Sequence, residues 1–401
     1  NKWAPFWSIG AKYRISNESF MENTKNWLTD LTIRGSYGTV GNQDIGYYAA
    51  MGLYNYGYSY NGKPGAIPYQ IANPDLKWEK KEEWNLGFDY GFFNERLSGS
   101  IDLYQRTTRD MVWEYNVPRP PYLYPTILAN AGTMKNKGLE IRLSAIPVQT
   151  KNFQWVTTLN YSTNEVVSLS NNQFRVESGY FYAGYLGNTI KQDTHIVKEG
   201  EQMGNFYGFK SIDVDENGKW IIQGKDGNPK PIDQQQQEDK MVLGNGLPKH
   251  FLSWDNTLTF KNFDLNLTMR GAFKYQILNT PRLYYEVPVS LAHGNLMATA
   301  YDPVFGKRPL NDHQELQYVS YYIENGDFWK IDNITIGYTL MLKDSFLKKV
   351  RVYATANNLC TITGYSGIDP EVNTQGLDPG VDPLNRYPST RSFTLGAMFT
   401  F

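Results

Sequence analysis

This sequence of 401 residues has no long apolar run, only one cysteine and no excess of either charge. No apolar run approaches the roughly 18 residues of a transmembrane helix, so helical membrane spans are not predicted. The single cysteine, Cys360, excludes an intramolecular disulfide. The formal net charge of −1 provides no electrostatic basis for nucleic-acid binding, and we expect no nucleic-acid partner.

Alternating strands are what the sequence offers instead. At the C-terminal end, Phe393, Leu395, Ala397, Phe399 and Phe401 share one face. The residues between them are polar or small, apart from Met398. This period of two predicts a β-strand that is long enough to cross a bilayer at a tilt.

The same pattern recurs along the whole chain. We predict eleven long strands, near 3–15, 29–39, 79–92, 96–110, 133–146, 152–167, 249–260, 262–275, 328–340, 349–357 and 389–401. In the segment 262–275, Leu265 and Leu267 alternate with Asp264, Asn266 and, further on, Arg270. Such charges would destabilise a soluble core but are tolerated on the watery side of a barrel wall. A soluble antiparallel sheet with one wet face remains the alternative at this point.

The connections between these strands favour the barrel. Short connections fall at 93–95, 147–151, 261–262 and 341–348, and long ones at 40–78, 111–132, 168–248, 276–327 and 358–388. Several long structureless loops are uncommon in soluble domains, whereas outer-membrane barrels have short periplasmic turns and long outer loops. Tryptophans near strand ends, such as Trp27, Trp78 and Trp113, are typical of interfacial aromatic girdles. We therefore predict an all-β fold, a transmembrane antiparallel β-barrel with long extracellular loops.

Several segments, taken together in this order, resemble the SusC-like branch of TonB-dependent outer-membrane transporters, the nutrient importers of Bacteroidetes-type bacteria. The most specific is NPDLKWEKKEEWNLGFDYGFFNERLSGSIDLYQRTTRDM at 73–111, followed by NAGTMKNKGLEIRL at 130–143. MGNFYGFKSI at 203–212, TFKNFDLNL at 259–267 and NITIGYTL at 333–340 also fit. The last two are VRVYATANNLCTITGYSGIDPEV at 350–372 and PSTRSFTLGAMFTF at 388–401.

The resemblance implies a 22-stranded barrel in the bacterial outer membrane, of which eleven strands are half. It implies that residues 1–401 are the C-terminal portion, and that the plug domain and the first barrel strands lie outside this sequence. The sequence also begins at Asn1, without a signal peptide. The implied partners are a SusD-like surface lipoprotein, the TonB complex acting through the N-terminal part, and outer-membrane lipid. The implied cargo is an oligosaccharide or another bulky nutrient, with peptides as the alternative.

One acidic segment resembles the first half of a calcium loop. Asp213, Asp215 and Asn217 place oxygens at positions one, three and five, and Gly218 stands at position six. Position twelve, where a bidentate Glu is expected, is Gly224. A Ca²⁺ site and a hairpin turn rich in Asp and Gly both remain open. We expect no other cofactor.

Tyrosines gather in the long connections. Tyr54, Tyr56, Tyr58 and Tyr60 stand at alternate positions of one loop, and the pair Tyr284 and Tyr285 occurs in another. Tyr presents a flat apolar ring and a hydroxyl, which suits sugars and protein interfaces. We take contact with the ligand or the lipoprotein lid as one interpretation, and packing of each loop on itself as the other.

No catalytic constellation emerges. The histidines His195, His250, His293 and His313 are scattered without metal-ligand spacing, and no glycine-flanked serine elbow or CxxC pair appears. We therefore predict a non-enzymatic importer. An outer-membrane hydrolase barrel and a soluble β-rich binding protein remain the rival classes. Inward positions such as Asn85, Asp102, Gln154, Asn160, Asp264, Asn266 and Arg270 are expected to line a lumen, mostly as solvated wall.

Overall fold

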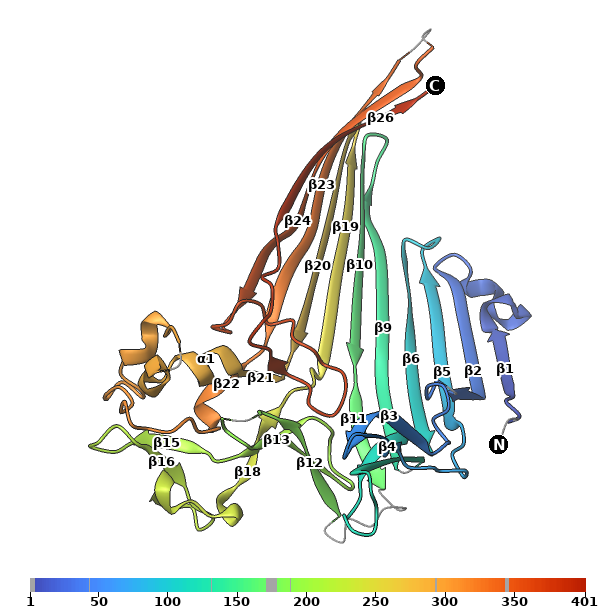
Figure 1. Ribbon diagram of the computed structural model, residues 1–401. Helices are drawn as coiled ribbons and strands as arrows, with labels where there is room; N and C mark the ends of the chain where they lie inside the picture. Colours follow the sequence, from blue (N-terminus) through green and yellow to red (C-terminus); the bar gives the residue numbers. More distant parts are fainter. Residues whose placement is uncertain are drawn as a thin grey trace.

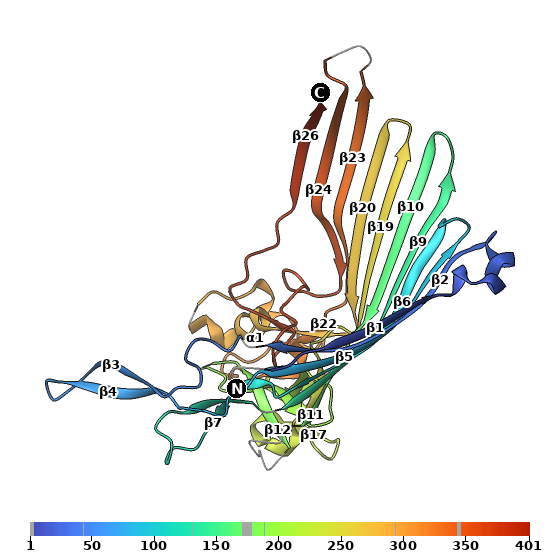
Figure 2. The same cartoon turned by 90° about the vertical axis from the view of Figure 1, so that its right-hand side faces the viewer.

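The computed structural model describes residues 4–42, 44–130, 132–170, 179–187, 189–292, 294–342 and 346–401. One long, strongly coiled antiparallel sheet dominates it (Figures 1 and 2). Its strands follow the order β1 (Ser8–Arg14), β2 (Leu28–Asn42), β5 (Glu79–Phe92), β6 (Leu97–Arg109), β9 (Thr133–Gln149), β10 (Phe153–Thr163), β19 (His250–Phe260), β20 (Phe263–Phe273), β23 (Phe328–Met341), β24 (Lys349–Thr363) and β26 (Ser392–Thr400).

Each of these strands pairs antiparallel with the next, so the sheet is a simple up-and-down meander. All eleven predicted strands are confirmed. β1 and β26 lie at the two ends of this strand order. The outward edge of each has no partner strand in the described part of the chain. The sheet is therefore an open wall and not a closed barrel.

Several strand boundaries differ from the prediction; β1, for example, begins at Ser8 and not near residue 3. Two of the differences change how the strands are divided. The strand predicted over 349–357 continues to Thr363, because Asn358 takes a left-handed backbone (φ 50°) at a bulge and the ladder then resumes. The segment predicted over 152–167 divides into β10 and the short β11 (Glu165–Ser170), which pairs with β9. A turn-forming residue is absorbed within the strand in the first case, whereas Asn164 interrupts the strand in the second.

The two faces of the wall have opposite chemistry. Ile336, Leu395 and Phe399 belong to the outer face and are exposed, as a surface in contact with lipid requires. Polar and charged residues alternate with them on the inner, concave side. A soluble sheet protein would cover such an apolar face, but here it lies bare over the described strands.

Short turns and long connections segregate to opposite ends of the wall (Figure 1). At the turn end, Phe93, Asn94 and Lys261 adopt positive φ, which lets the chain reverse within a few residues. Trp27 stacks on Phe92 near this end, as an interfacial aromatic girdle would. The predicted alternation of short and long connections is confirmed.

The long connections were predicted as loops, apart from a hairpin turn considered at 213–218, but they contain strands and sheets of their own. They contain the hairpins β3 (Leu53–Tyr60) with β4 (Lys63–Gln70) and β7 (Val112–Asn116) with β8 (Thr126–Asn130). They also contain a four-stranded sheet of β12 (Tyr180–Tyr185), β13 (Asp193–Lys198), β14 (Asn205–Gly208) and β18 (Met241–Asn245). A three-stranded sheet joins β15 (Ser211–Val214), β16 (Trp220–Gln223) and β17 (Pro229–Pro231), and another joins β22 (Ile323–Asn325), β21 (Gln276–Asn279) and β25 (Val381–Asp382).

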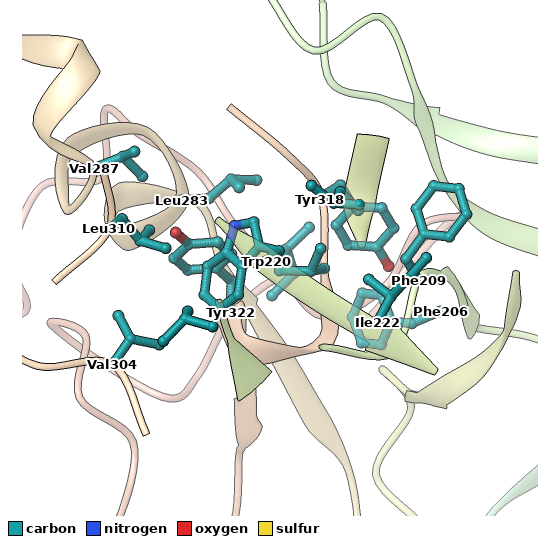
Figure 3. Close-up of a cluster of buried hydrophobic side chains, with 14 residues drawn as sticks. Phe206, Phe209, Trp220, Ile222, Leu283, Val287, Val304, Leu310, Tyr318 and Tyr322 are labelled. Carbon is teal, nitrogen blue, oxygen red and sulfur yellow. The ribbon is translucent and has the colours of Figure 1, made fainter. Parts of the chain in front are cut away.

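The main hydrophobic core lies among these connections and not in the wall. We call the described parts of residues 179–248 and 276–326 the loop cap. Trp220, Ile222, Leu283, Tyr318 and Tyr322 are fully buried there (Figure 3). They come from two connections that are distant in sequence, so the loop cap is a folded layer on one end of the wall. Within the described ranges, no helix has the length and apolarity to cross a membrane.

Candidate functional site

The inner side of the wall, which we call the lumenal face, is polar along its full width. One ladder of paired positions runs through Thr32, Asp89, Ser100, Arg142, Asn160, Ser253, Arg270 and Lys330. The predicted inward positions Asn85, Asp102, Gln154, Asn160, Asp264, Asn266 and Arg270 all fall on this face. Alternation alone was sufficient to place them.

Many charges on the lumenal face are neutralised by neighbours. The guanidinium of Arg34 donates to Asp102 at 2.6 Å and to Asp89 at 3.1 Å. Farther along the wall, Arg106 donates to Glu83 at 2.8 Å and Arg351 to Asp264 at 2.5 Å. These cross-strand pairs hold the side chains against the wall, so they serve chiefly as its solvated lining.

The connection between β24 and β26, residues 364–391, enters the lumen, and we call it the strap. Its Glu371 accepts hydrogen bonds from Arg270 at 2.9 Å and from the ammonium of Lys330 at 2.6 Å. Lys330 is buried and also lies 3.3 Å from Asp369. Burial raises the pKa of Glu371, but the bonds from Arg270 and Lys330 outweigh it, and the net pKa lies below its usual value. The strap is thus ionically fastened to β20 and β23.

The far end of the strap is fastened to the loop cap. β25 pairs in parallel with β21, and the backbone N–H of Leu278 donates to Gly380 at 2.8 Å. Gly380 has φ +82°, and a Cβ there would lie 2.6 Å from the Cα of Gly246. Only glycine fits such a position. One segment therefore couples the wall to the cap (Figure 1).

A buried histidine completes this junction. His195 has one ring nitrogen 2.7 Å from the hydroxyl of Thr194 and the other 2.9 Å from the carbonyl oxygen of Pro379 in the strap. Its ring centroid lies 4.4 Å from that of Phe206. Burial lowers the pKa of His195 to about 4, so the ring is neutral at neutral pH.

A cavity of about 570 Å³ lies between the strap and the lumenal face. Its walls come from β6, β9, β10, β19 and β20, and residues 370–374 of the strap close one side. Ser100, Glu140, Arg142, Asn160, Ser253, Arg270 and Glu371 are among the lining residues. Sequence reasoning placed Asn160 and Arg270 in the lumen but missed this enclosure, because no local pattern brings residues 370–374 beneath the strands.

The tyrosines of the first long connection are exposed. Tyr54, Tyr56, Tyr58 and Tyr60 are 58%, 74%, 51% and 84% exposed along β3. The β3–β4 hairpin projects away from the wall (Figure 2). This geometry favours contact with another molecule over packing of the loop on itself. Contact with a ligand or lid stays a prediction.

The second tyrosine pair lies differently. Tyr284, in α1 (Thr280–Tyr285), donates its hydroxyl to the carbonyl oxygen of Leu186 at 2.5 Å and packs against the buried core of the loop cap. Tyr285 is partly exposed. Tyr284 therefore stabilises the cap, and only Tyr285 presents a ring to the outside. Their predicted ligand contact is untested.

The predicted calcium loop forms the turn of the β15–β16 hairpin. The Asp213 carboxylate pairs with the ammonium of Lys307, which holds the pKa of Asp213 below its usual value. Asp215 accepts the backbone N–H groups of Asn217 at 2.9 Å and Lys219 at 2.8 Å, and Asn311 donates to the Asn217 carbonyl at 2.9 Å. These partners account for the turn without an ion, and a Ca²⁺ site stays a prediction.

The histidines remain dispersed. The ring of His250 lies 2.8 Å from the Tyr161 hydroxyl, and His313 is an exposed neighbour of Asp312. His293 lies outside the described residues. Over the ranges that the structure describes, no group of three or more His, Cys, Asp or Glu side chains could hold a metal ion.

Comparison with known proteins agrees with the barrel-like geometry of the wall. Residues 1–359 match the family described as TonB-dependent receptor-like, β-barrel. The chain belongs to this family. The TonB-dependent receptor SusC of Bacteroides thetaiotaomicron is 31% identical, with 100% of this chain and 40% of SusC covered. The TonB-dependent receptor P39 of Formosa agariphila is 28% identical, with 100% and 43% covered. The SusC-like resemblance is confirmed.

Solved structures agree with this TonB-dependent receptor assignment. The RagAB peptide transporter matches with a TM-score of 0.83 and 25% identity over 99% of this chain and 43% of its own. The RagAB peptide importer in its open-open state matches with a TM-score of 0.82 and 26% identity. The chain spans less than half the length of the relatives that it matches. As a TonB-dependent receptor barrel, it belongs to the outer membrane, with the turn end periplasmic and the loop cap extracellular.

Lys330→Met should loosen the strap of this TonB-dependent receptor. The substitution leaves the buried carboxylate of Asp369 without its ammonium partner, which destabilises by about 3 kcal/mol. We expect faster amide hydrogen exchange over residues 366–375 of the intact transporter. Lys137→Met, which breaks an exposed pair with Glu165, is the control and should change little. Unaltered exchange in Lys330→Met would show that the ion pairs do not hold the strap.

Acid should destabilise the loop cap through His195. Its pKa is about 4 in the folded cap and about 6.5 in an unfolded chain, so the unfolded state binds the extra proton first. Stability is full above pH 6.5 and falls progressively toward pH 4, by about 3 kcal/mol in total. Hydrogen exchange of β13 at pH 7 and pH 5 measures this. His195→Gln should flatten the pH dependence between these values, whereas the exposed His313→Gln should retain it.

Proposed function

We propose that this chain is the C-terminal barrel portion of an outer-membrane nutrient importer of the SusC type, energised through TonB. The observation that carries the proposal is the continuous polar lumenal face. The opposite face of the same wall is apolar and uncovered over the described strands, and the loop cap lies at one end of the wall. A wall of this kind separates lipid from an aqueous passage. Family membership and the SusC relative support the same function.

The unpaired edges β1 and β26 support a larger barrel. Open strand edges are not tolerated in hydrocarbon, because their N–H and C=O groups would lack partners. We infer that further strands outside residues 1–401 close the wall, and that a plug domain, also outside this sequence, occupies the lumen. TonB would act through that missing part.

The β3–β4 hairpin supports a SusD-like lipoprotein as the partner at the extracellular mouth. The four tyrosines of β3 are exposed and form part of an aromatic, nearly uncharged surface, in which Lys63 is the only charged side chain from Leu53 to Gln70. Aromatic residues are enriched and charges depleted at the centres of protein interfaces. The lipoprotein would seat on this surface while capturing cargo.

The cargo class has two candidates. SusC similarity supports an oligosaccharide or a similarly bulky nutrient. The structural likeness to the RagAB peptide transporter favours a peptide. The hydrolase alternative gains no support from the described histidines, since His195 is buried, His250 lies beside the Tyr161 hydroxyl and His313 is exposed beside Asp312.

Import is tested in cells that express the intact transporter together with its SusD-like lipoprotein. Uptake of labelled maltohexaose and of a labelled mixture of short peptides is measured with and without a protonophore. We expect protonophore-sensitive uptake of at least one of them, absent from cells that lack the transporter. Equal accumulation with and without the transporter for both cargoes would contradict import.

The lipoprotein interface is tested by replacing Tyr54, Tyr56, Tyr58 and Tyr60 together. Serines should weaken association with the lipoprotein by at least about tenfold, because they remove the ring area that aromatic anchors supply. Phenylalanines at the same positions, which keep that area, are the matched control. Co-purification and surface plasmon resonance measure the effect. Full affinity in the serine variant would exclude the hairpin from the interface.

A further inference from the structure

The cavity beneath the strap carries two charges that take part in no close ion pair within the described ranges. Five charged residues line it: Asp102, Glu140, Arg142, Arg270 and Glu371. Asp102 is paired with Arg34, and Arg270 with Glu371. Among the described residues, neither Glu140 nor Arg142 forms a close ion pair or a side-chain hydrogen bond, although Glu140 interacts electrostatically with Arg106 at longer range. They differ in this from the paired charges around them.

Their positions on β9 define a spacing. They are two residues apart, so both project into the lumen from one strand face, with their Cα atoms roughly 7 Å apart. Ser100 and Asn160 flank Arg142 in the ladder, and Asp102 and Ser162 flank Glu140. Both side chains are exposed to the lumen, so neither is required for packing.

Charge alternation at this spacing matches one kind of extended molecule. In an extended peptide, residues i and i+2 lie on the same side and are also roughly 7 Å apart. A cargo strand lying along β9 with a basic and an acidic side chain at such positions would pair with both wall residues. A neutral sugar can hydrogen-bond to both groups through its hydroxyls but neutralises neither charge, so a charge-matched ligand gains the additional attraction between opposite charges.

We propose that Glu140 and Arg142 form a charge-matching subsite for oligopeptides that carry a basic and an acidic side chain two residues apart. The carboxylate of Glu140 receives the basic group, and the guanidinium of Arg142 receives the acidic group. Because β9 runs from the loop cap toward the turn end, Glu140 lies nearer the extracellular mouth. This inference rests on the proposed import function and specifies its cargo.

The test uses the purified intact transporter in complex with its lipoprotein. Binding of the blocked tripeptide acetyl-Lys-Ala-Glu-amide is compared with that of acetyl-Met-Ala-Gln-amide, a neutral peptide of similar shape, by isothermal titration calorimetry. We expect the charged peptide to bind at least tenfold more tightly. The preference should fall in Glu140→Gln and in Arg142→Met, and should vanish in the double variant.

Asp255→Asn is the matched control. Asp255 is another carboxylate of the lumenal face without an ion-pair partner among the described residues, but it does not line the cavity. This variant should keep the full preference. Equal binding of the two peptides by the native protein would overturn the proposal, and so would a preference that persists in the double variant. Thermal unfolding of each variant confirms that it is folded.

Uptake separates this inference from the proposed function. If the double variant still takes up the neutral peptide by a protonophore-sensitive route, import is intact, and loss of discrimination between the peptides supports the subsite. If the native transporter does not distinguish the charged from the neutral peptide but still imports maltohexaose, the proposed subsite is wrong and the import function stands. Native protein that imports none of the three would overturn both.

Discussion

Backbone hydrogen bonding in a medium without water is the constraint on which the rest of this structure depends. Each strand of the wall from β2 to β24 satisfies its N–H and C=O groups through two neighbours, so hydrocarbon can contact the outer face. The side chains are then free to differ on the two faces. Ile336 meets lipid while Thr335, one residue away, bonds to Thr355 on the inner side.

The same constraint explains where the hydrophobic core lies. A wall whose outer face contacts lipid and whose inner face contacts water has no interior of its own. Buried apolar residues such as Trp220 and Tyr318 therefore gather in the loop cap, where the chain is again surrounded by water and must pack on itself. The strap bridges these two environments, using ion pairs toward the lumen and backbone pairing toward the cap.

Sequence reasoning succeeded where the determining interaction is local. A period of two locates every strand of the wall and assigns Asn160 and Arg270 to the lumen, because alternation depends only on neighbouring residues. It failed for the loop cap, since the partners of Trp220 include Tyr322, about a hundred positions away. The junction of Lys330 with Glu371 was hidden for the same reason. Tyr54 and Tyr56 were recognised as candidates, but their exposure could be seen only from the direction of the hairpin.

The contact between His195 and the carbonyl of Pro379 joins residues 184 positions apart. Neighbouring hairpins of the wall can form as soon as their two strands are available, but this junction must wait for nearly the whole chain. The mouth of the wall therefore depends on a contact of high sequence separation, which its own short hairpins cannot supply.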